Sequence, residues 1–219
     1  MSSFVRRRSV LRFVTGGGAI ALTGPGFAVV APKQAVAEQD PAGQLVQRAA
    51  NQGIEVAKAN GGATREAGIR QVLEAYFDLA YVGRSTLGSY WNQATPEQRE
   101  RFLKASASTE AHAYAERFGQ YRGQTLTVDR VNTPGNGVSI VDSTLTQSGG
   151  DPVAIQWEVH NEGQGPRIVD VKTEGVSMIM TRRADYVSYI RNYGGQVGPL
   201  IDELESRAKQ RTTAQQQPR

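Results

Sequence analysis

The chain carries few side chains of the kinds that catalyse reactions or hold metal ions. It has two histidines, His112 and His160, and no cysteine, so neither a disulfide nor a thiolate nucleophile can form. His160 falls on the polar face of a predicted strand and His112 lies off the apolar stripe of a predicted helix, so we expect both rings to be solvated. No His, Asp and Glu residues cluster at the short spacing of a metal site, and no metal or other cofactor is expected.

Two aspartates, Asp142 and Asp170, are the strongest candidates for catalysis. Each is flanked by apolar residues in a predicted strand, and burial in a small cone-shaped α+β domain would raise the carboxyl pKa and make a general base. The competing interpretation is that Asp170 points outward or pairs with a basic residue at the edge of the domain. The reason is that strand alternation places Asp170 on the other face of the strand from Val169 and Val171. Neither aspartate has a catalytic partner nearby in the sequence, so we expect a protein that is not an enzyme.

The first 37 residues have the features of an export signal. The segment from Arg7 to Arg12 resembles a twin-arginine motif, a mild apolar stretch covers residues 13–30, and Ala35-Val36-Ala37 is a cleavage site. An uncleaved membrane anchor is the alternative, but it needs about 20 strongly apolar residues, and glycines and a proline interrupt this stretch. We therefore expect residues 1–37 to be removed and the remainder to be periplasmic.

Cleavage changes the charge of the protein. The whole chain has a formal charge of +4, and its first 37 residues contain five basic and no acidic side chains, so the remainder carries −1. A chain without excess positive charge lacks the basic surface that neutralises phosphates, and nucleic-acid binding is not expected. Strong attraction to anionic membranes is not expected either.

Apolar residues at helical spacing predict a series of helices. The first lies around Leu45–Val56, and a stronger one runs from Ile69 to Ala80. Thr95 is a predicted N-cap, with Pro96 at the first helical position and Gln98 as the return partner of a capping box. The helix that it starts is expected to end at Gly123. Two further helices cover 186–193 and 197–204, and a flexible tail covers residues 211–219.

Four segments rich in β-branched and aromatic residues lie between these helices. Turn clusters of Gly, Pro and Asn at hairpin spacing separate them, which predicts an antiparallel meander. The segments are Gln124–Val131, Val138–Gln147, Val153–Asn161 and Arg167–Met180. Because one face of the third segment is apolar, helices must cover it, and we expect an α+β domain over residues 38–210 with a curved four-stranded sheet.

Three segments carry a resemblance to a known family. They are Phe77–Ala80, the stretch from Leu87 through Trp91 to the Thr95 helix start, and Asp170–Ser177. Together they resemble the MlaC-type periplasmic lipid-binding proteins, the soluble component of a "toluene tolerance" ABC transport system. The resemblance covers about residues 69–204, which is most of the chain after the signal.

The resemblance implies a function that needs no catalytic residue. It implies a monomeric shuttle that holds the acyl chains of a phospholipid in an apolar cavity between sheet and helices and so serves outer-membrane lipid asymmetry. The partners that it implies are an inner-membrane MCE-domain ABC transporter and an outer-membrane lipoprotein–porin complex. Arg182 and Arg183 are candidates for headgroup or partner contact, although solvated positions at a helix start are the simpler interpretation.

The residues expected to line the cavity are large and mostly apolar. Periodicity alone favours an ordinary core, because most apolar stripes simply pack together, whereas the resemblance favours a cavity. The predicted lining, with the methionines placed on strands, is Val72, Tyr76, Tyr81, Phe102, Ile155, Trp157, Met178, Met180, Tyr186 and Tyr189.

Small residues follow the Thr95 helix start, from Ala105 to Ala111, where the resembled proteins carry larger apolar side chains. They could widen the cavity for a rigid polycyclic lipid such as a hopanoid. The competing interpretation is a close contact between helices at alanine.

Overall fold

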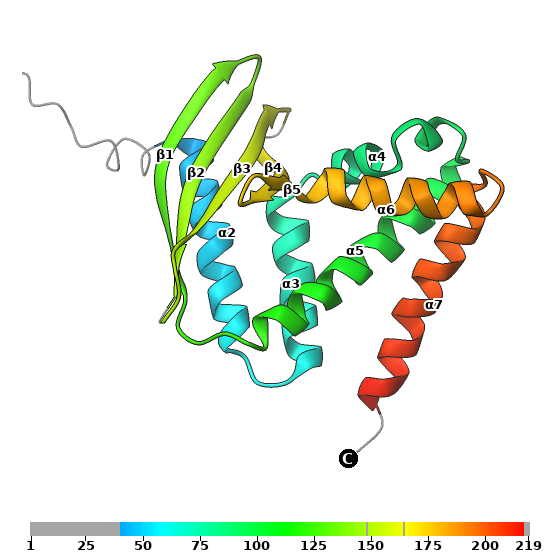
Figure 1. The fold of residues 1–219 in the computed structure, drawn as a ribbon, viewed down its shortest axis with the longest axis horizontal. Coiled ribbons are helices and arrows are strands. Elements are labelled where there is room, and N and C mark those ends of the chain that lie inside the picture. Colours follow the sequence, from blue (N-terminus) through cyan, green and yellow to red (C-terminus); the bar gives the residue numbers. More distant parts are fainter. Residues whose placement is uncertain (1–39, 148, 164, 217–219) are drawn as a thin grey trace, which may run out of the picture. The chain divides into compact units, whose positions relative to one another are not determined.

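We describe a computed structural model of the chain over residues 40–147, 149–163 and 165–216. Within these residues the protein combines α-helices with one antiparallel sheet (Figure 1), so the predicted α+β class is confirmed. The predicted export signal lies outside the described residues.

Among the described residues, four α-helices precede the sheet and two follow it. The first four are α2 (Pro41–Lys58), α3 (Gly62–Tyr76), α4 (Leu79–Leu87) and, after the short 3-10 helix η1 (Gly88–Asn92), α5 (Pro96–Phe118). The last two are α6 (Met178–Asn192) and α7 (Val197–Gln216). α7 therefore extends beyond the predicted domain boundary at residue 210. No helix of the described part is long and apolar enough to cross a bilayer.

The sheet is a meander in which every neighbouring pair of strands is antiparallel. Its order is β1-β2-β3-β4-β5, and its strands are β1 (Thr125–Gly135), β2 (Val138–Thr146), β3 (Val153–Glu162), β4 (Gly165–Thr173) and β5 (Val176–Ser177). The four predicted strands thus exist, and the two-residue β5 is an addition. Two register shifts, after Val128 and after Asn132, interrupt the pairing of the edge strand β1 with β2.

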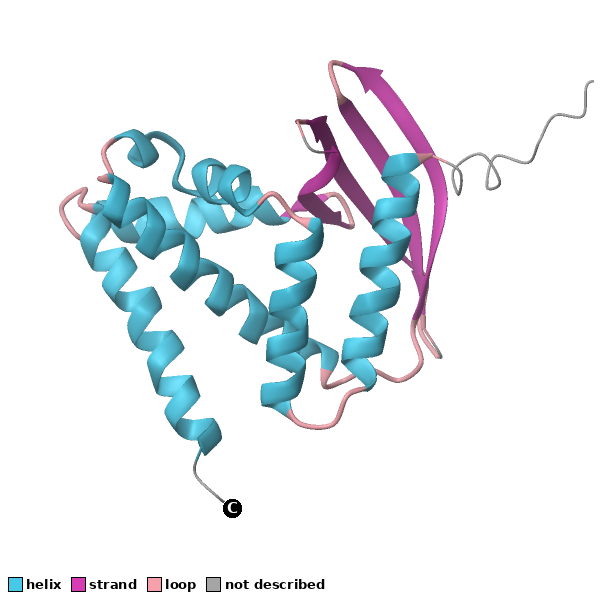
Figure 2. Ribbon diagram, turned by 180° about the vertical axis from the view of Figure 1, so that it is seen from behind, coloured by secondary structure: helices cyan, strands magenta, loops and turns pink. Residues whose placement is uncertain are grey.

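Helix α2 lies across one face of the sheet, as Figure 2 shows from behind. Leu45 and Val46 of α2 pack there against Val128, Val141, Val159 and Ile168, one from each of the four long strands. These side chains are nearly or fully buried, and burying each one stabilises the fold by about 1.5–3 kcal/mol. The predicted alternation of β3 is confirmed at Val159, which faces this core.

The long helix α5 begins as predicted. The backbone N–H of Gln98 donates to Thr95 Oγ1 at 3.2 Å, and the backbone N–H of Thr95 donates to Gln98 Oε1 at 3.0 Å, which completes the capping box. At the other end, α5 stops at Phe118 and not at the predicted Gly123. Its first half packs against α6 and α7 through fully buried Phe102, Ile190 and Ile201.

The predicted helix from Ile69 to Ala80 is wrong, because two helices share this stretch. The chain leaves the helical conformation at Phe77, and the N–H of Asp78 donates to the carbonyl of Ile168 on β4 at 3.0 Å. The Asp78 carboxylate then accepts a hydrogen bond from the N–H of Tyr81 at 2.8 Å and starts α4. Contact with a distant strand therefore overrides the local helical pattern.

The predicted fourth strand, Arg167–Met180, is also too long. Glu174 and Gly175 have φ values of +50° and +79°, which turn the chain after β4. Ser177 then caps α6 by accepting a hydrogen bond from the N–H of Met180 at 3.1 Å. Met178 and Met180, predicted on a strand, therefore lie in the first turn of a helix.

Asp170 fastens this helix start to the sheet. Its Oδ1 accepts hydrogen bonds from the N–H groups of Val171 at 2.9 Å and Ile179 at 3.1 Å, and its Oδ2 accepts one from the Ser177 hydroxyl at 2.5 Å. Only 7% of Asp170 is exposed. The prediction that this acid points outward or pairs with a rim base is wrong, because the start of α6 covers it.

We expect Asp170→Ala to lower the free energy of unfolding by about 2–3 kcal/mol, because it leaves buried donors without an acceptor. Urea unfolding followed by circular dichroism measures this loss. Asp142→Ala is the control, since Asp142 pairs with the exposed Arg130 and such pairs contribute less than about 1 kcal/mol. Equal losses in the two variants would show that Asp170 does not anchor α6.

Candidate functional site

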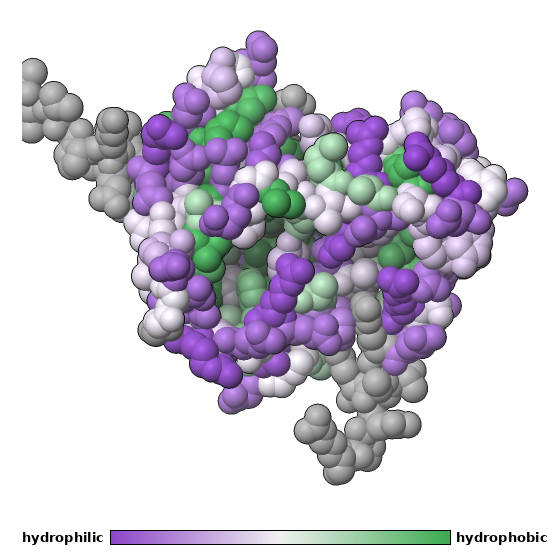
Figure 3. All heavy atoms as spheres, in the orientation of Figure 1, coloured by the Kyte–Doolittle hydropathy of each residue, from purple (hydrophilic) through white to green (hydrophobic). Residues whose placement is uncertain are grey.

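The face drawn in Figure 1 is hollowed between the strands and the helices, and hydrophobic side chains lie at the bottom of the hollow (Figure 3). The elements around it carry half-buried hydrophobic side chains that pack beside two of the core clusters. These are Val56, Tyr76, Phe77, Leu79, Tyr114, Phe118, Leu126, Val131, Trp157 and Val171. Apolar surface that the fold leaves partly exposed is available to an apolar ligand.

An inner pocket of about 50 Å³ lies among α3, α4, α5 and α6. Most of its lining is apolar, and its polar side chains are few. The lining includes Leu73, Phe77, Val82, Leu103, Ala107, Tyr114, Met178, Ile179 and Tyr186, with Thr86, Ser106, Glu110 and Arg182 as polar members. A largely apolar lining with a few polar groups is typical of small-molecule sites.

An outer groove of about 330 Å³ lies between α5, α6 and α7. Apolar and aromatic side chains line part of it, namely Ala113, Tyr186, Tyr189, Leu200 and Leu204. Its other side chains are polar or charged, and they are Thr109, Glu110, His112, Glu116, Arg182, Asp185, Glu203 and Arg207. The groove can therefore contact both an apolar chain and a charged group.

An ion pair between Glu110 of α5 and Arg182 of α6 borders both the inner pocket and the outer groove. Arg182 Nε donates to Glu110 Oε1, and Nη2 donates to Oε2 at 3.1 Å. The hydrogen bonds that Arg182 donates to Glu110 are the main reason that the pKa of Arg182 is raised. The guanidinium therefore stays charged at every physiological pH.

Two phenols lie close to the Glu110 carboxylate. Burial raises the pKa of Tyr114 to about 12, and the charge of Glu110 adds to the rise. Burial and then Glu110 raise the pKa of Tyr186 in the same direction. Both hydroxyls are therefore neutral at physiological pH, and that of Tyr114 donates to the sulfur of Met178.

The structure brings three of the predicted lining residues to these pockets. Met178 lines the inner pocket, Tyr189 lines the outer groove, and Tyr186 lines both. Ile155 and Trp157 are half-buried on β3, where Trp157 Nε1 donates to Ser143 Oγ at 2.9 Å. Tyr76 packs beside the same sheet cluster as Trp157.

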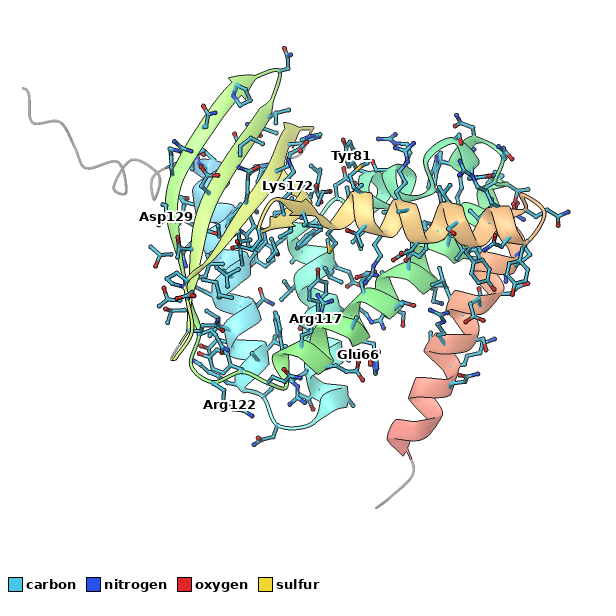
Figure 4. The ribbon with its side chains drawn as sticks, viewed as in Figure 1. Glu66, Tyr81, Arg117, Arg122, Asp129 and Lys172 are labelled. Atoms are coloured by element: carbon cyan, nitrogen blue, oxygen red, sulfur yellow. The ribbon has the colours of Figure 1, made fainter. Side chains whose placement is uncertain are left out.

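The other four predicted lining residues lie elsewhere. Phe102 is fully buried and packs edge-on against Tyr186, with ring centroids 5.6 Å apart, and Val72 is also buried. Tyr81, labelled in Figure 4, meets the ring of His160 edge-on at 4.8 Å. Met180 is 60% exposed and lines neither pocket. The lipid contacts assigned to these residues stay predictions.

Both histidines are paired with carboxylates, so the expectation that they are solvated is wrong. Nδ1 of His112 lies 2.9 Å from Glu66 Oε2, and its Nε2 lies 3.3 Å from Glu116 Oε1. Nε2 of His160 lies 2.9 Å from Glu158 Oε1. Each histidine side chain is only 16% exposed. Within the described residues, no group of three or more His, Cys, Asp or Glu side chains could hold a metal ion.

The aspartates do not have the environment of a general base. Burial alone would raise the pKa of Asp142, but the hydrogen bonds from Gln156 and Arg130 outweigh it and lower that pKa. A lowered pKa is the opposite of the predicted shift. Asp170 is occupied in holding the start of α6.

The small residues of α5 serve two purposes. Ala105 and Ala111 are buried in contacts between helices, as the competing interpretation expects. Ser106 and Ala107, in contrast, line the inner pocket. Sequence reasoning missed Glu110 and Tyr114 as pocket residues and gave Arg182 no partner, because 72 positions separate Glu110 from Arg182.

Comparisons with known proteins agree on one family. The family model described as "MlaC protein" matches residues 46–206. A curated relative from Haemophilus influenzae, the "Intermembrane phospholipid transport system binding protein MlaC", is 25% identical over 193 residues, which cover 84% of this chain and 89% of the relative.

A solved structure has a similar fold. It is that of a phospholipid-binding protein from Ralstonia solanacearum in complex with a phospholipid, and the likeness has a TM-score of 0.66 at 23% identity. The likeness covers 82% of this chain and 98% of the solved one.

Raising the pH should destabilise the protein through Tyr114. Above its unfolded pKa of 10.0 the phenol ionises in the unfolded chain, while in the folded protein it stays protonated to about pH 12. The free energy of unfolding should therefore fall across this interval, by up to about 2–3 kcal/mol for a shift of two pKa units. Urea titrations at several pH values measure it, and in Tyr114→Phe the fall should be smaller. An unchanged slope in the variant would contradict the burial of the phenol.

Proposed function

The chain belongs to the MlaC protein family, and on that basis we propose that it is a phospholipid-binding shuttle of the periplasm. It encloses the acyl chains of one lipid at a time and carries the lipid across the aqueous space between two membranes. The observation that carries this proposal is the family match over residues 46–206, which includes the elements around the hollow and the inner pocket, from most of α2 to α7.

The two relatives support the nature of the ligand. The Haemophilus protein is named as the binding protein of an intermembrane phospholipid transport system, and the Ralstonia structure holds a phospholipid. In this chain, half-buried Tyr114, Phe118 and Trp157 are suited to such a ligand, because apolar surface left partly open by the fold can be covered by acyl chains.

The physical need for enclosure is large. Moving one methylene out of water is favourable by about 0.8 kcal/mol of free energy. A two-chain lipid therefore does not cross an aqueous space at useful rates with its tails exposed. Binding by burial needs no nucleophile, general base or metal. The family match therefore supports a binding protein and not an enzyme. Met178 at the inner pocket suits a flexible chain, since its side chain is unbranched and polarizable.

The proposed shuttle has a membrane partner at each end of its route. The shuttle receives and delivers lipid at an inner-membrane MCE-domain ABC transporter and an outer-membrane lipoprotein–porin complex, as the family resemblance implies. Export through the twin-arginine pathway would place it between them.

A polycyclic lipid such as a hopanoid is the second candidate cargo. One observation favours it, namely the small side chains of Ser106 and Ala107 at the inner pocket. Phospholipid ranks first, because it is the lipid that both relatives are named for.

Met178→Glu should abolish lipid binding without unfolding the protein. The new carboxylate would lie in the inner pocket, where an acyl chain cannot solvate it, yet an acidic residue in the first turn of α6 suits the helix dipole. The protein is purified from periplasmic extract, and native mass spectrometry with lipid extraction measures bound phospholipid.

The matched control is Val176→Glu, which adds the same charge two residues earlier at a position that is 64% exposed. We expect phospholipid in the wild type and in the control, and none in Met178→Glu. Wild-type protein that carries no phospholipid and takes none up from detergent would overturn the proposed function. A hopanoid in the extract would show that the cargo is a polycyclic lipid and not a phospholipid.

A further inference from the structure

We propose that the outer groove between α5, α6 and α7 is an entrance to the inner pocket, and that the Glu110–Arg182 ion pair closes this route. The lipid enters when its phosphate takes the place of the Glu110 carboxylate on Arg182, so that an acyl chain can pass between α5 and α6. This inference rests on the proposed function and names the route by which the lipid reaches its site.

The two cavities meet at three side chains. Glu110, Arg182 and Tyr186 line both the inner pocket and the outer groove, and we call these three residues the partition. On one side of the partition lie the apolar residues of the inner pocket, including Leu103 and Met178. On the other side lie Leu200 and Leu204 of α7. A displacement of these side chains would therefore join the apolar lining of the inner pocket to the apolar part of the outer groove.

Neither cavity is large enough by itself for a lipid with two acyl chains. Sites for small molecules usually occupy about 300–1,000 Å³, and the inner pocket, at about 50 Å³, is far below this range. The outer groove, at about 330 Å³, only reaches its lower end. A lipid with two chains therefore needs the cavities to join or to expand.

The partition has the properties of a closure that can open. The side chains of Arg182 and Glu110 are 29% and 17% exposed, so water reaches the pair from the groove. Arg182 also lies 3.5 Å from Asp185, which keeps a second carboxylate near the guanidinium when Glu110 leaves. Partly hydrated ion pairs contribute little net stability, so separating this pair is far less costly than breaking a fully buried one.

The chemistry of the pair selects the group that opens it. Removing the closest partner of a partly buried charge is unfavourable, and another anion on Arg182 avoids this cost. A phosphate diester presents oxygens that match the bidentate donors of a guanidinium in the way that the Glu110 carboxylate does. A phospholipid can therefore exchange with Glu110, whereas a lipid without phosphate cannot.

Uptake kinetics test the proposal. Vesicles of phosphatidylcholine and phosphatidylglycerol supply a pyrene-labelled phosphatidylglycerol, and transfer to the protein is followed by fluorescence. We expect Glu110→Gln to speed both uptake and release about fivefold, because it weakens the closure while keeping the side-chain shape. Exchanging the two residues, with Glu110→Arg and Arg182→Glu together, should restore the slow rate.

Arg101→Gln is the matched control. Arg101 also lies on α5 and makes a bidentate ion pair, with Glu205 of α7, but neither residue lines either cavity. Its rates should equal those of the wild type. A Glu110→Gln variant with wild-type rates would overturn the proposed entrance, even if its stability falls.

A second lipid tests the role of the phosphate. Labelled diacylglycerol has the same chains without phosphate and should enter the wild type more slowly than phosphatidylglycerol. In Arg182→Gln this difference should disappear, and its persistence would overturn the exchange on Arg182. Should Glu110→Gln fail to fold, Arg182→Lys replaces it, because lysine keeps the charge and loses the bidentate contact, and faster uptake is again expected. If the wild type takes up neither lipid, the proposed function itself fails.

Discussion

The buried carboxylate of Asp170 holds the sheet and α6 in a fixed relation, and most of the candidate site depends on that relation. Its oxygens bind the Ser177 hydroxyl and the N–H of Ile179, so the first turn of α6 is fastened to β4. The helix that starts there supplies Met178, Arg182 and Tyr186 to the cavities. These hydrogen bonds therefore help to set the position of the α6 residues at the site.

What the sequence predicted well depends on local interactions. The start of α5 follows from Thr95, Pro96 and Gln98, which lie within one turn of each other. The meander follows from alternating side chains and from turn residues at hairpin spacing. The predictions failed where a distant segment decides the local conformation. The carbonyl of Ile168 accepts a hydrogen bond from the N–H of Asp78, and this contact ends the helix predicted through Phe77. The residues around Phe77 alone do not reveal a contact with so distant a strand.

The candidate site was predictable by residue type and less so by position. Apolar periodicity indicated Tyr186 and Tyr189, because large apolar side chains on an amphipathic helix must face another surface, whereas Met178 was predicted on a strand. It could not separate them from Phe102, which has the same spacing signal and is fully buried. The partition could not be predicted, since the partnership of Glu110 with Arg182 arises only when α5 and α6 cross.

The edge strand β1 has a consequence for the proposed shuttle. An exposed edge offers unpaired backbone groups to a second sheet, and proteins that stay separate interrupt such edges. Two register shifts distort β1, Pro134 lacks a backbone donor, and Asp129 and Arg130 place charge at the first shift. Strand addition by another copy is therefore unfavourable, which suits the proposed diffusion of single molecules.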